Sequence, residues 1–181
     1  MSATVTSALP ASEITVRELQ GCNVEELEAL YRQAPEPDSV KGLDGKPQGR
    51  MLATVGLDWK PVAQLLRAFN ETPVFPWLGK GFSAETEATG SGNNRINLLG
   101  YRTEWFTFDT RLEPSVIDGR TCILLDYDHD DNPFFIRRIR DELREVSPGV
   151  FLGPAMARTG TRHIPILYFS VDCTNGNAGE P

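Results

Sequence analysis

The chain contains 181 residues, of which 40% are hydrophobic and 24% are charged, and it carries a formal net charge of -7. A chain of this length is typical of a single domain that buries a substantial core. The negative charge argues against nucleic acid or anionic lipid as a partner, because both present negative phosphates.

The two ends and the cysteines indicate the domain organisation and the compartment. Residues 1–12 and 174–181 are small and polar, so we expect disordered ends around one domain over residues 13–173. Residues 1–10 have neither the basic start nor the apolar run that we expect of a signal peptide, and no stretch approaches the ~20 apolar residues that span a bilayer. Three widely spaced cysteines predict neither a disulfide framework nor a zinc site. We therefore expect a cytoplasmic protein without membrane contact.

The first half of the chain predicts two helices and one strand. Asn23 can cap a helix over residues 23–33, with Glu26 placed to complete a capping box. Residues 50–57 alternate between apolar and polar side chains, which predicts a strand. A second apolar stripe at helical spacing predicts a helix over residues 58–69.

The next segments predict a loop and two strands. Residues 83–94 are rich in Gly, Ser, Thr and Glu, the composition of an exposed loop. Residues 101–112 alternate regularly and predict a long strand, with phenylalanines on one face and a mixture of aromatic and polar side chains on the other. Residues 121–127 are apolar on both faces, which favours a central strand.

The last third predicts a helix and a hairpin. Residues 133–146 keep helical apolar spacing after Asn132, and Arg137 and Asp141 would be i,i+4 partners on a solvated face. Residues 150–157 and 164–171 predict two strands that pair as a hairpin. Because helices and strands do not alternate regularly, we predict an antiparallel sheet curled into a barrel.

The acidic loop over residues 126–131 holds the densest cluster of ionisable groups. Its alternate aspartates suggest calcium ligands, but the glycine and glutamate that an EF-hand requires are missing, so we predict no metal site. Histidine is the usual acid–base residue near neutral pH. If the chain is an enzyme, His129, Asp126 and Tyr127 are therefore the candidate catalytic residues; the alternative is a solvated turn.

Aromatic side chains with polar tips are the candidate ligand-binding residues. Tyr101 and Trp105 share a strand face with threonines and an aspartate, a composition that suits a wet cavity better than a dry core. The same set includes Trp59, Trp77 and Tyr168, for which packing in the core is the alternative interpretation.

Motifs for nucleotides and for nucleophilic catalysis are missing. Neither GxGxxG nor GxxxxGK[ST] nor GxSxG occurs, and Gly79-Lys80-Gly81 is too short to hold a phosphate. We therefore predict no cofactor.

Several short motifs follow one another along residues 23–172: Pro35 after the first helix, Gly49 before a strand, Trp77-x-Gly79-Lys80-x-Phe82, Asp126…Pro133…Arg138, Phe151-Leu152-Gly153, and Tyr168-Phe169 in a closing strand. In this order they resemble the small bacterial lipocalin-like (calycin-type) barrels. The resemblance implies an antiparallel barrel with an apolar ligand inside, and it transfers no catalytic residue. The Gly-x-Trp signature of lipocalins is missing before the first strand.

We thus predict an α+β, mainly β fold, an antiparallel lipocalin-like β-barrel with two or three flanking helices. The expected function is binding of a small apolar or aromatic molecule inside the barrel. The alternative is a cofactor-independent cyclase, isomerase or lyase that acts on a hydrophobic substrate in the same cavity. A subunit without a ligand of its own is a third alternative. The sequence offers no basis for predicting the oligomeric state.

Overall fold

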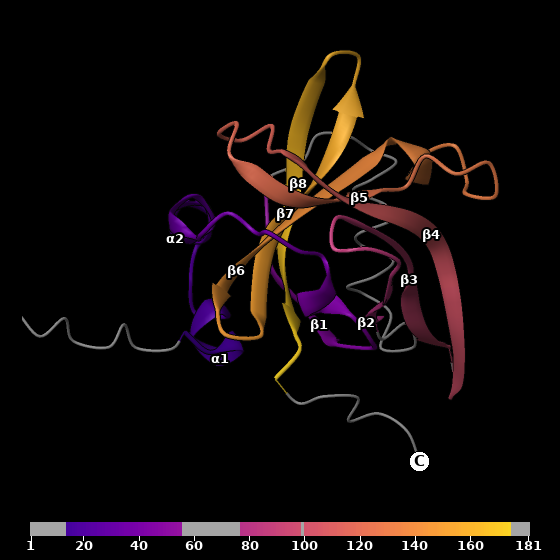
Figure 1. The fold of residues 1–181 in the computed structure, drawn as a ribbon, viewed down its shortest axis with the longest axis horizontal. Helices are drawn as coiled ribbons and strands as arrows, with labels where there is room; N and C mark the ends of the chain where they lie inside the picture. The colour runs from indigo at the N-terminus through magenta and orange to yellow at the C-terminus, as the bar shows by residue number, and fades with distance from the viewer. Residues whose placement is uncertain (1–13, 56–76, 99, 175–181) are drawn as a thin grey trace, which may run out of the picture.

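The computed structural model describes residues 14–55, 77–98 and 100–174. Its strands form one closed barrel of eight strands (Figure 1). This confirms the predicted fold, a mainly β antiparallel barrel with flanking helices. In chain order the strands are β1 (Gln48–Thr54), β2 (Trp77–Ala84), β3 (Thr89–Leu98), β4 (Tyr101–Pro114), β5 (Thr121–Asp126), β6 (Ile139–Ser147), β7 (Val150–Thr159) and β8 (Arg162–Asp172).

Each strand pairs antiparallel with the next, and β8 pairs with β1 to close the barrel. The β1–β8 register runs from Gln48 opposite Asp172 to Thr54 opposite Leu167. Within the described ranges, β1 and β2 share one paired position, Gln48 opposite Gly79. The seam between β1 and β2 is therefore the least continuous part of the described wall.

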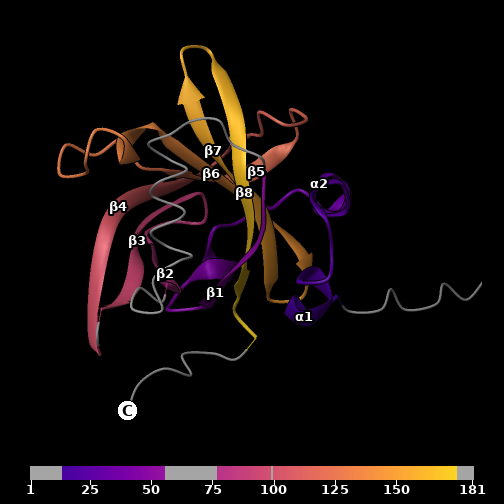
Figure 2. The ribbon, with the colours of Figure 1, turned by 180° about the vertical axis from the view of Figure 1, so that it is seen from behind.

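Two helices precede the barrel and lie against its outer side (Figure 2). They are α1 (Val16–Leu19) and α2 (Val24–Gln33). The predicted capping box of α2 is confirmed: Asn23 Oδ1 accepts from the Glu26 N–H at 2.9 Å, and Glu26 Oε2 accepts from the Asn23 N–H at 2.8 Å. These bonds satisfy donors that the first turn leaves without helical partners, so α2 begins where the sequence indicated.

Apolar side chains form two clusters, one on each side of the barrel wall. The inner cluster lies inside the barrel and includes Phe108, Leu143 and Phe169. The outer cluster joins Leu19 and Leu27 of the helices to side chains of β5, β7 and β8. The wall is therefore buried on both faces where the helices cover it.

Charged groups also lie under α2, on the outer face of β6. Arg144 is fully buried, and its guanidinium forms two 2.7 Å bonds to the Asp118 carboxylate and lies 4.5 Å from the centroid of the Tyr31 ring. Glu142 accepts a 2.9 Å hydrogen bond from the Tyr31 hydroxyl. Because a buried charge needs partners, these contacts fix α2 and the β4–β5 connection to the wall.

The prediction of a helix over residues 133–146 is wrong. The chain forms one short 3₁₀ turn, η2 (Ile136–Arg138), and then strand β6. Asp141 and Leu143 of β6 are buried in the barrel, while Glu142 and Arg144 are buried beneath α2. Charges on both faces hide the apolar alternation that marks a strand. The arginines of this segment therefore do not form one solvated helix face.

The loop predicted over residues 83–94 is wrong in part, because β2 and β3 continue through most of it as a hairpin. Its glycines suggested a loop, but Gly92 has a packing role. A Cβ at Gly92 would lie 2.5 Å from a ring atom of Phe108, so the small residue admits this ring to the core.

Other predictions of local structure have mixed outcomes. The strands predicted over residues 101–112 and 121–127 and the closing hairpin are confirmed as β4, β5 and β7–β8. The predicted helix over residues 58–69 and the residues expected to be disordered, apart from Thr174, lie outside the described ranges. Among the helices of the described ranges, none is long and apolar enough to cross a membrane.

Candidate functional site

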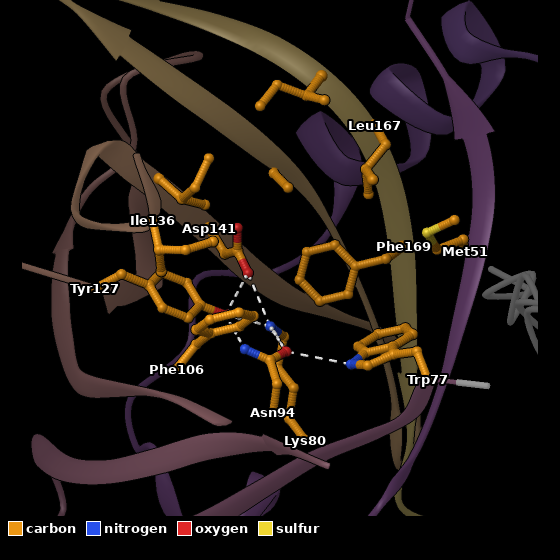
Figure 3. A pocket seen from close by; sticks show the side chains of 13 residues that line it. Met51, Trp77, Lys80, Asn94, Phe106, Tyr127, Ile136, Asp141, Leu167 and Phe169 are labelled. Atoms are coloured by element: carbon orange, nitrogen blue, oxygen red, sulfur yellow. Dashed lines mark hydrogen bonds and ion pairs between the residues drawn. The ribbon is translucent and has the colours of Figure 1, made fainter. Parts of the chain in front are cut away.

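The barrel contains a partly open cavity of about 120 Å³. Most of its wall is apolar, and Figure 3 shows aromatic and aliphatic side chains on several sides of a small polar cluster. The apolar wall includes Met51, Trp77, Phe106, Ala155, Leu167 and Phe169, and the polar residues are Lys80, Asn94, Tyr127 and Asp141.

An ion pair between two strands forms the centre of the polar cluster. Lys80 of β2 places its Nζ 2.9 Å from Oδ2 of Asp141 on β6, and each side chain is 4% exposed. An isolated charge in such an environment would be strongly unfavourable, so each residue depends on the other.

The Lys80 ammonium has three hydrogen-bond acceptors. Besides Asp141 Oδ2, it donates to Asn94 Oδ1 at 3.1 Å and to the Tyr127 hydroxyl. Four ring centroids also lie 5.1 to 5.6 Å from Nζ, those of Trp77, Phe108, Tyr127 and Phe169. The three protons of the ammonium are thus used, and the ring faces add cation–π attraction.

The remaining polar atoms complete a connected network (Figure 3). The Tyr127 hydroxyl donates to Asp141 Oδ2 at 3.0 Å and accepts from Asn94 Nδ2 at 3.2 Å. Trp77 Nε1 donates to Asn94 Oδ1 at 3.2 Å. Strands β2, β3 and β6, together with Tyr127 just after β5, therefore contribute to one network, which fixes the side-chain positions around the cavity.

Burial shifts the proton equilibria of two of these groups. It lowers the pKa of Lys80, although the neighbouring Asp141 carboxylate opposes this change. Burial raises the pKa of Tyr127 well above its usual value, and the negative charge of Asp141 raises it further. Tyr127 therefore stays protonated at neutral pH and serves as a hydrogen-bond donor.

One oxygen of the cluster lacks a partner. Asp141 Oδ1 is buried and accepts no hydrogen bond from any residue that the structure describes. Because Asp141 lines the cavity, its unfilled acceptor is a feature that a bound molecule could satisfy.

The β1–β2 seam positions Trp77 through close backbone packing. Gly79 has a φ of 125°, and a Cβ there would lie 2.5 Å from the Gly49 backbone nitrogen. A Cβ at Gly49 would lie 2.5 Å from the Trp77 ring. The two glycines thus leave room for the Trp77 indole to lie over the seam. Its ring centroid is 6.0 Å from that of Phe169, in an edge-to-face contact.

Phe106 lines the cavity in an unusual backbone conformation. Its φ is 60°, at a register shift between β3 and β4. A positive φ at a bulky residue costs about 1–3 kcal/mol. Such a bulge can redirect a side chain next to a site, and here the residue that carries the strain forms part of the cavity wall.

The expectation that Tyr101 and Trp105 face the cavity is corrected by the structure. Their side chains are 81% and 39% exposed, and neither lines the cavity. The predicted alternation of β4 is right, but the opposite face, with Phe106 and Phe108, turns inward. The mixed aromatic and polar face points to solvent, where its polar groups keep their hydration.

The candidate catalytic residues do not converge. Tyr127 points into the barrel, whereas Asp126 pairs with Arg111 at 2.9 Å. His129 Nε2 lies 3.3 Å from Asp109 Oδ1, in the loop after β5. Adjacent residues of an extended segment point to opposite sides, which explains the separation of Tyr127 from Asp126.

The other predicted ligand-binding residues have different positions. Trp77 lines the cavity, as expected. Tyr168, which the sequence suggested as a ligand-binding residue, is fully buried in the outer cluster under the helices and does not line the cavity. Trp59 lies outside the described residues.

Sequence reasoning missed Lys80, Asn94 and Asp141 as site residues. One signal was present: Lys80 lies between two glycines in an otherwise apolar and aromatic segment, Trp77 to Phe82. A single charge in such a segment is equally compatible with a buried, paired group and with a surface turn. Among the residues that the structure describes, no group of three or more His, Cys, Asp or Glu side chains is placed to hold a metal ion.

Comparison with known proteins supports the fold. No protein-family model matches the chain, and no curated protein sequence matches it. The chain is similar to the crystal structure of a protein from Thermomonospora curvata, with a TM-score of 0.50 and 20% sequence identity over 83% of this chain and 87% of that chain. At this identity the likeness concerns the barrel fold alone.

Proposed function

We propose that the protein binds a small, mostly apolar molecule inside the barrel. The observation that carries the proposal is an apolar cavity of about 120 Å³ that contains a buried polar cluster. Burial of apolar surface supplies binding free energy, and a few fixed polar groups supply orientation, which is the usual composition of a small-molecule site.

The size of the cavity limits the size of the ligand. An engineered apolar cavity of about 150 Å³ in another protein binds benzene. The cavity of about 120 Å³ in this barrel therefore suits a molecule of about one ring, or a branched aliphatic molecule of similar size.

A second candidate function, cofactor-independent isomerisation or elimination, is favoured by the ionisable groups at the cavity. Asp141 offers, as a base, a carboxylate oxygen that has no hydrogen-bond donor among the described residues, in place of His129 and Asp126. To separate the candidates, small molecules released from the purified protein can be incubated with fresh protein. A binding protein returns the compound unchanged, and an enzyme converts it.

Isothermal titration calorimetry with toluene tests the proposed binding. The wild-type chain should bind toluene saturably, and Ala155→Leu should abolish binding because the added side chain fills the cavity. Ala88→Leu, at an exposed turn position, is the matched control and should bind as the wild type does.

A variant with a larger cavity guards against loss of folding in Ala155→Leu. Ile166 also lines the cavity, so Ile166→Ala should admit a larger probe such as naphthalene. The absence of saturable binding in the wild type and in Ile166→Ala would contradict the proposal.

A further inference from the structure

The hydrogen-bonding inventory of the polar cluster restricts the chemistry of its ligand. Lys80 uses its three protons on Asp141 Oδ2, Asn94 Oδ1 and the Tyr127 hydroxyl. The Tyr127 hydroxyl uses its proton on Asp141 Oδ2. Neither the ammonium nor the phenol therefore has a proton left for an acceptor on a ligand.

The unfilled capacity is an acceptor. Asp141 Oδ1 is buried, belongs to a cavity-lining side chain and has no donor among the residues that the structure describes. A ligand atom that donates a hydrogen bond would remove the unfavourable free energy of this unpaired oxygen. A hydrogen bond to a carboxylate is also stronger than one between neutral groups.

The charges of the cluster exclude an anionic ligand. Lys80 and Asp141 neutralise each other, and the ammonium is already surrounded by acceptors and aromatic rings. The carboxylate of an anionic ligand would be repelled by the Asp141 carboxylate and would find no free proton on Lys80 or Tyr127. It would also lose its hydration on entering the cavity.

We propose that the cavity selects an uncharged molecule with a hydroxyl group, such as a small phenol or alcohol, and that Asp141 Oδ1 accepts the hydroxyl proton in a hydrogen bond. This inference rests on the proposed binding function and specifies the polar group that the ligand carries. A hydroxyl suits the site because it donates to the carboxylate and leaves the rest of the molecule free to contact the apolar wall.

Three probes that share a methyl-substituted benzene ring test the selection: toluene, p-cresol and 4-methylbenzoate, each titrated calorimetrically into the full-length protein at neutral pH. We expect p-cresol to bind about tenfold more tightly than toluene, because it adds one charge-assisted hydrogen bond. We expect no binding of 4-methylbenzoate.

The double variant Lys80→Met/Asp141→Leu removes the polar pair and keeps an apolar cavity. It should bind toluene and lose the preference for p-cresol. The comparison of probes on the wild type does not depend on how this variant folds.

The outcomes separate the two proposals. Equal affinities of the wild type for toluene and p-cresol, or binding of 4-methylbenzoate, would overturn the inference about the hydroxyl and leave the binding function intact. A wild type that binds none of the three probes would overturn both. A preference for p-cresol that survives in the double variant would show that Asp141 does not cause it.

Discussion

Lys80 and Asp141 form a 2.9 Å ion pair inside the barrel, and each side chain is 4% exposed. The pair joins β2 to β6, which are not neighbours in the sheet. The two charges stabilise the interior only together, because either one alone would be a buried charge without a counter-ion.

Replacement of one member of this pair should be strongly destabilising. We expect Lys80→Met to lower the free energy of unfolding by about 3–5 kcal/mol, since it leaves Asp141 buried and unpaired. We expect Lys80→Met/Asp141→Leu to recover most of this loss. Urea denaturation followed by circular dichroism measures both values.

An exposed pair provides the control for this series. Lys41 pairs with Glu87 at the surface, where the side chains are 55% and 65% exposed. Lys41→Met should change the free energy of unfolding by about 1 kcal/mol or less. A Lys80→Met variant as stable as Lys41→Met would show that Lys80 is not buried as a charge.

Tyr127 should make the stability of the protein sensitive to alkaline pH. Its pKa in the folded state is raised, so the folded chain keeps a proton that the unfolded chain loses above about pH 10. The stability from this group is complete below pH 10 and declines as the pH rises, by up to about 1.4 kcal/mol per pH unit.

Tyr127→Phe removes this contribution to the pH dependence. The difference in unfolding free energy between wild type and Tyr127→Phe, measured in urea from pH 8 to 11, should shrink as the pH rises. A difference that stays constant or grows over this range would contradict the burial of the phenol.

The close packing of Gly49 against Trp77 predicts that this position does not tolerate a methyl group. In Gly49→Ala the Cβ would lie 2.5 Å from the indole and 2.6 Å from the Gly79 Cα, and the ring or the strand must move. We expect a loss of about 1–3 kcal/mol. Gly21→Ala is the control, because its Cβ would meet the nearest atom at 3.4 Å. Equal free energies of unfolding for the two variants would contradict the close packing of Gly49 against Trp77 and Gly79.

The two tryptophans of β2 and β4 should differ in their effect on binding. Trp77 lines the cavity, so Trp77→Ala should weaken the binding of toluene about tenfold through loss of apolar contact. Trp105 does not line the cavity, and Trp105→Ala should leave the affinity within about twofold of the wild type. Calorimetric titration of both variants with toluene measures these affinities. A larger loss of affinity in Trp105→Ala than in Trp77→Ala would contradict the structure and support the sequence prediction that Trp105 faces the cavity.

Elements with local signals were predictable from the sequence. The capping box of Asn23 and Glu26 depends on residues three apart, and the structure contains it. The hairpin of β7 and β8 follows from two apolar runs separated by a short turn around Gly160. Both depend on neighbouring residues, so one sequence is enough to identify them.

The candidate site depends on contacts between residues distant in the chain. Asp141 has helical spacing from Arg137 and looked like part of a solvated face, but its partner is Lys80 on another strand. The inward face of β4 was also ambiguous, because alternation separates two faces without saying which one meets the core. The bulge at Phe106 has no glycine to mark it, although its φ is positive.

The most direct test uses the indole N–H resonances of the three tryptophans in a two-dimensional ¹H–¹⁵N spectrum. Trp77 Nε1 donates to Asn94 Oδ1 at the cavity, and Trp77→Phe assigns its signal. On titration with p-cresol we expect a saturable shift of the Trp77 signal and a constant Trp105 signal. A Trp77 signal that does not move, or a saturable shift of Trp105 alone, would contradict binding inside the barrel.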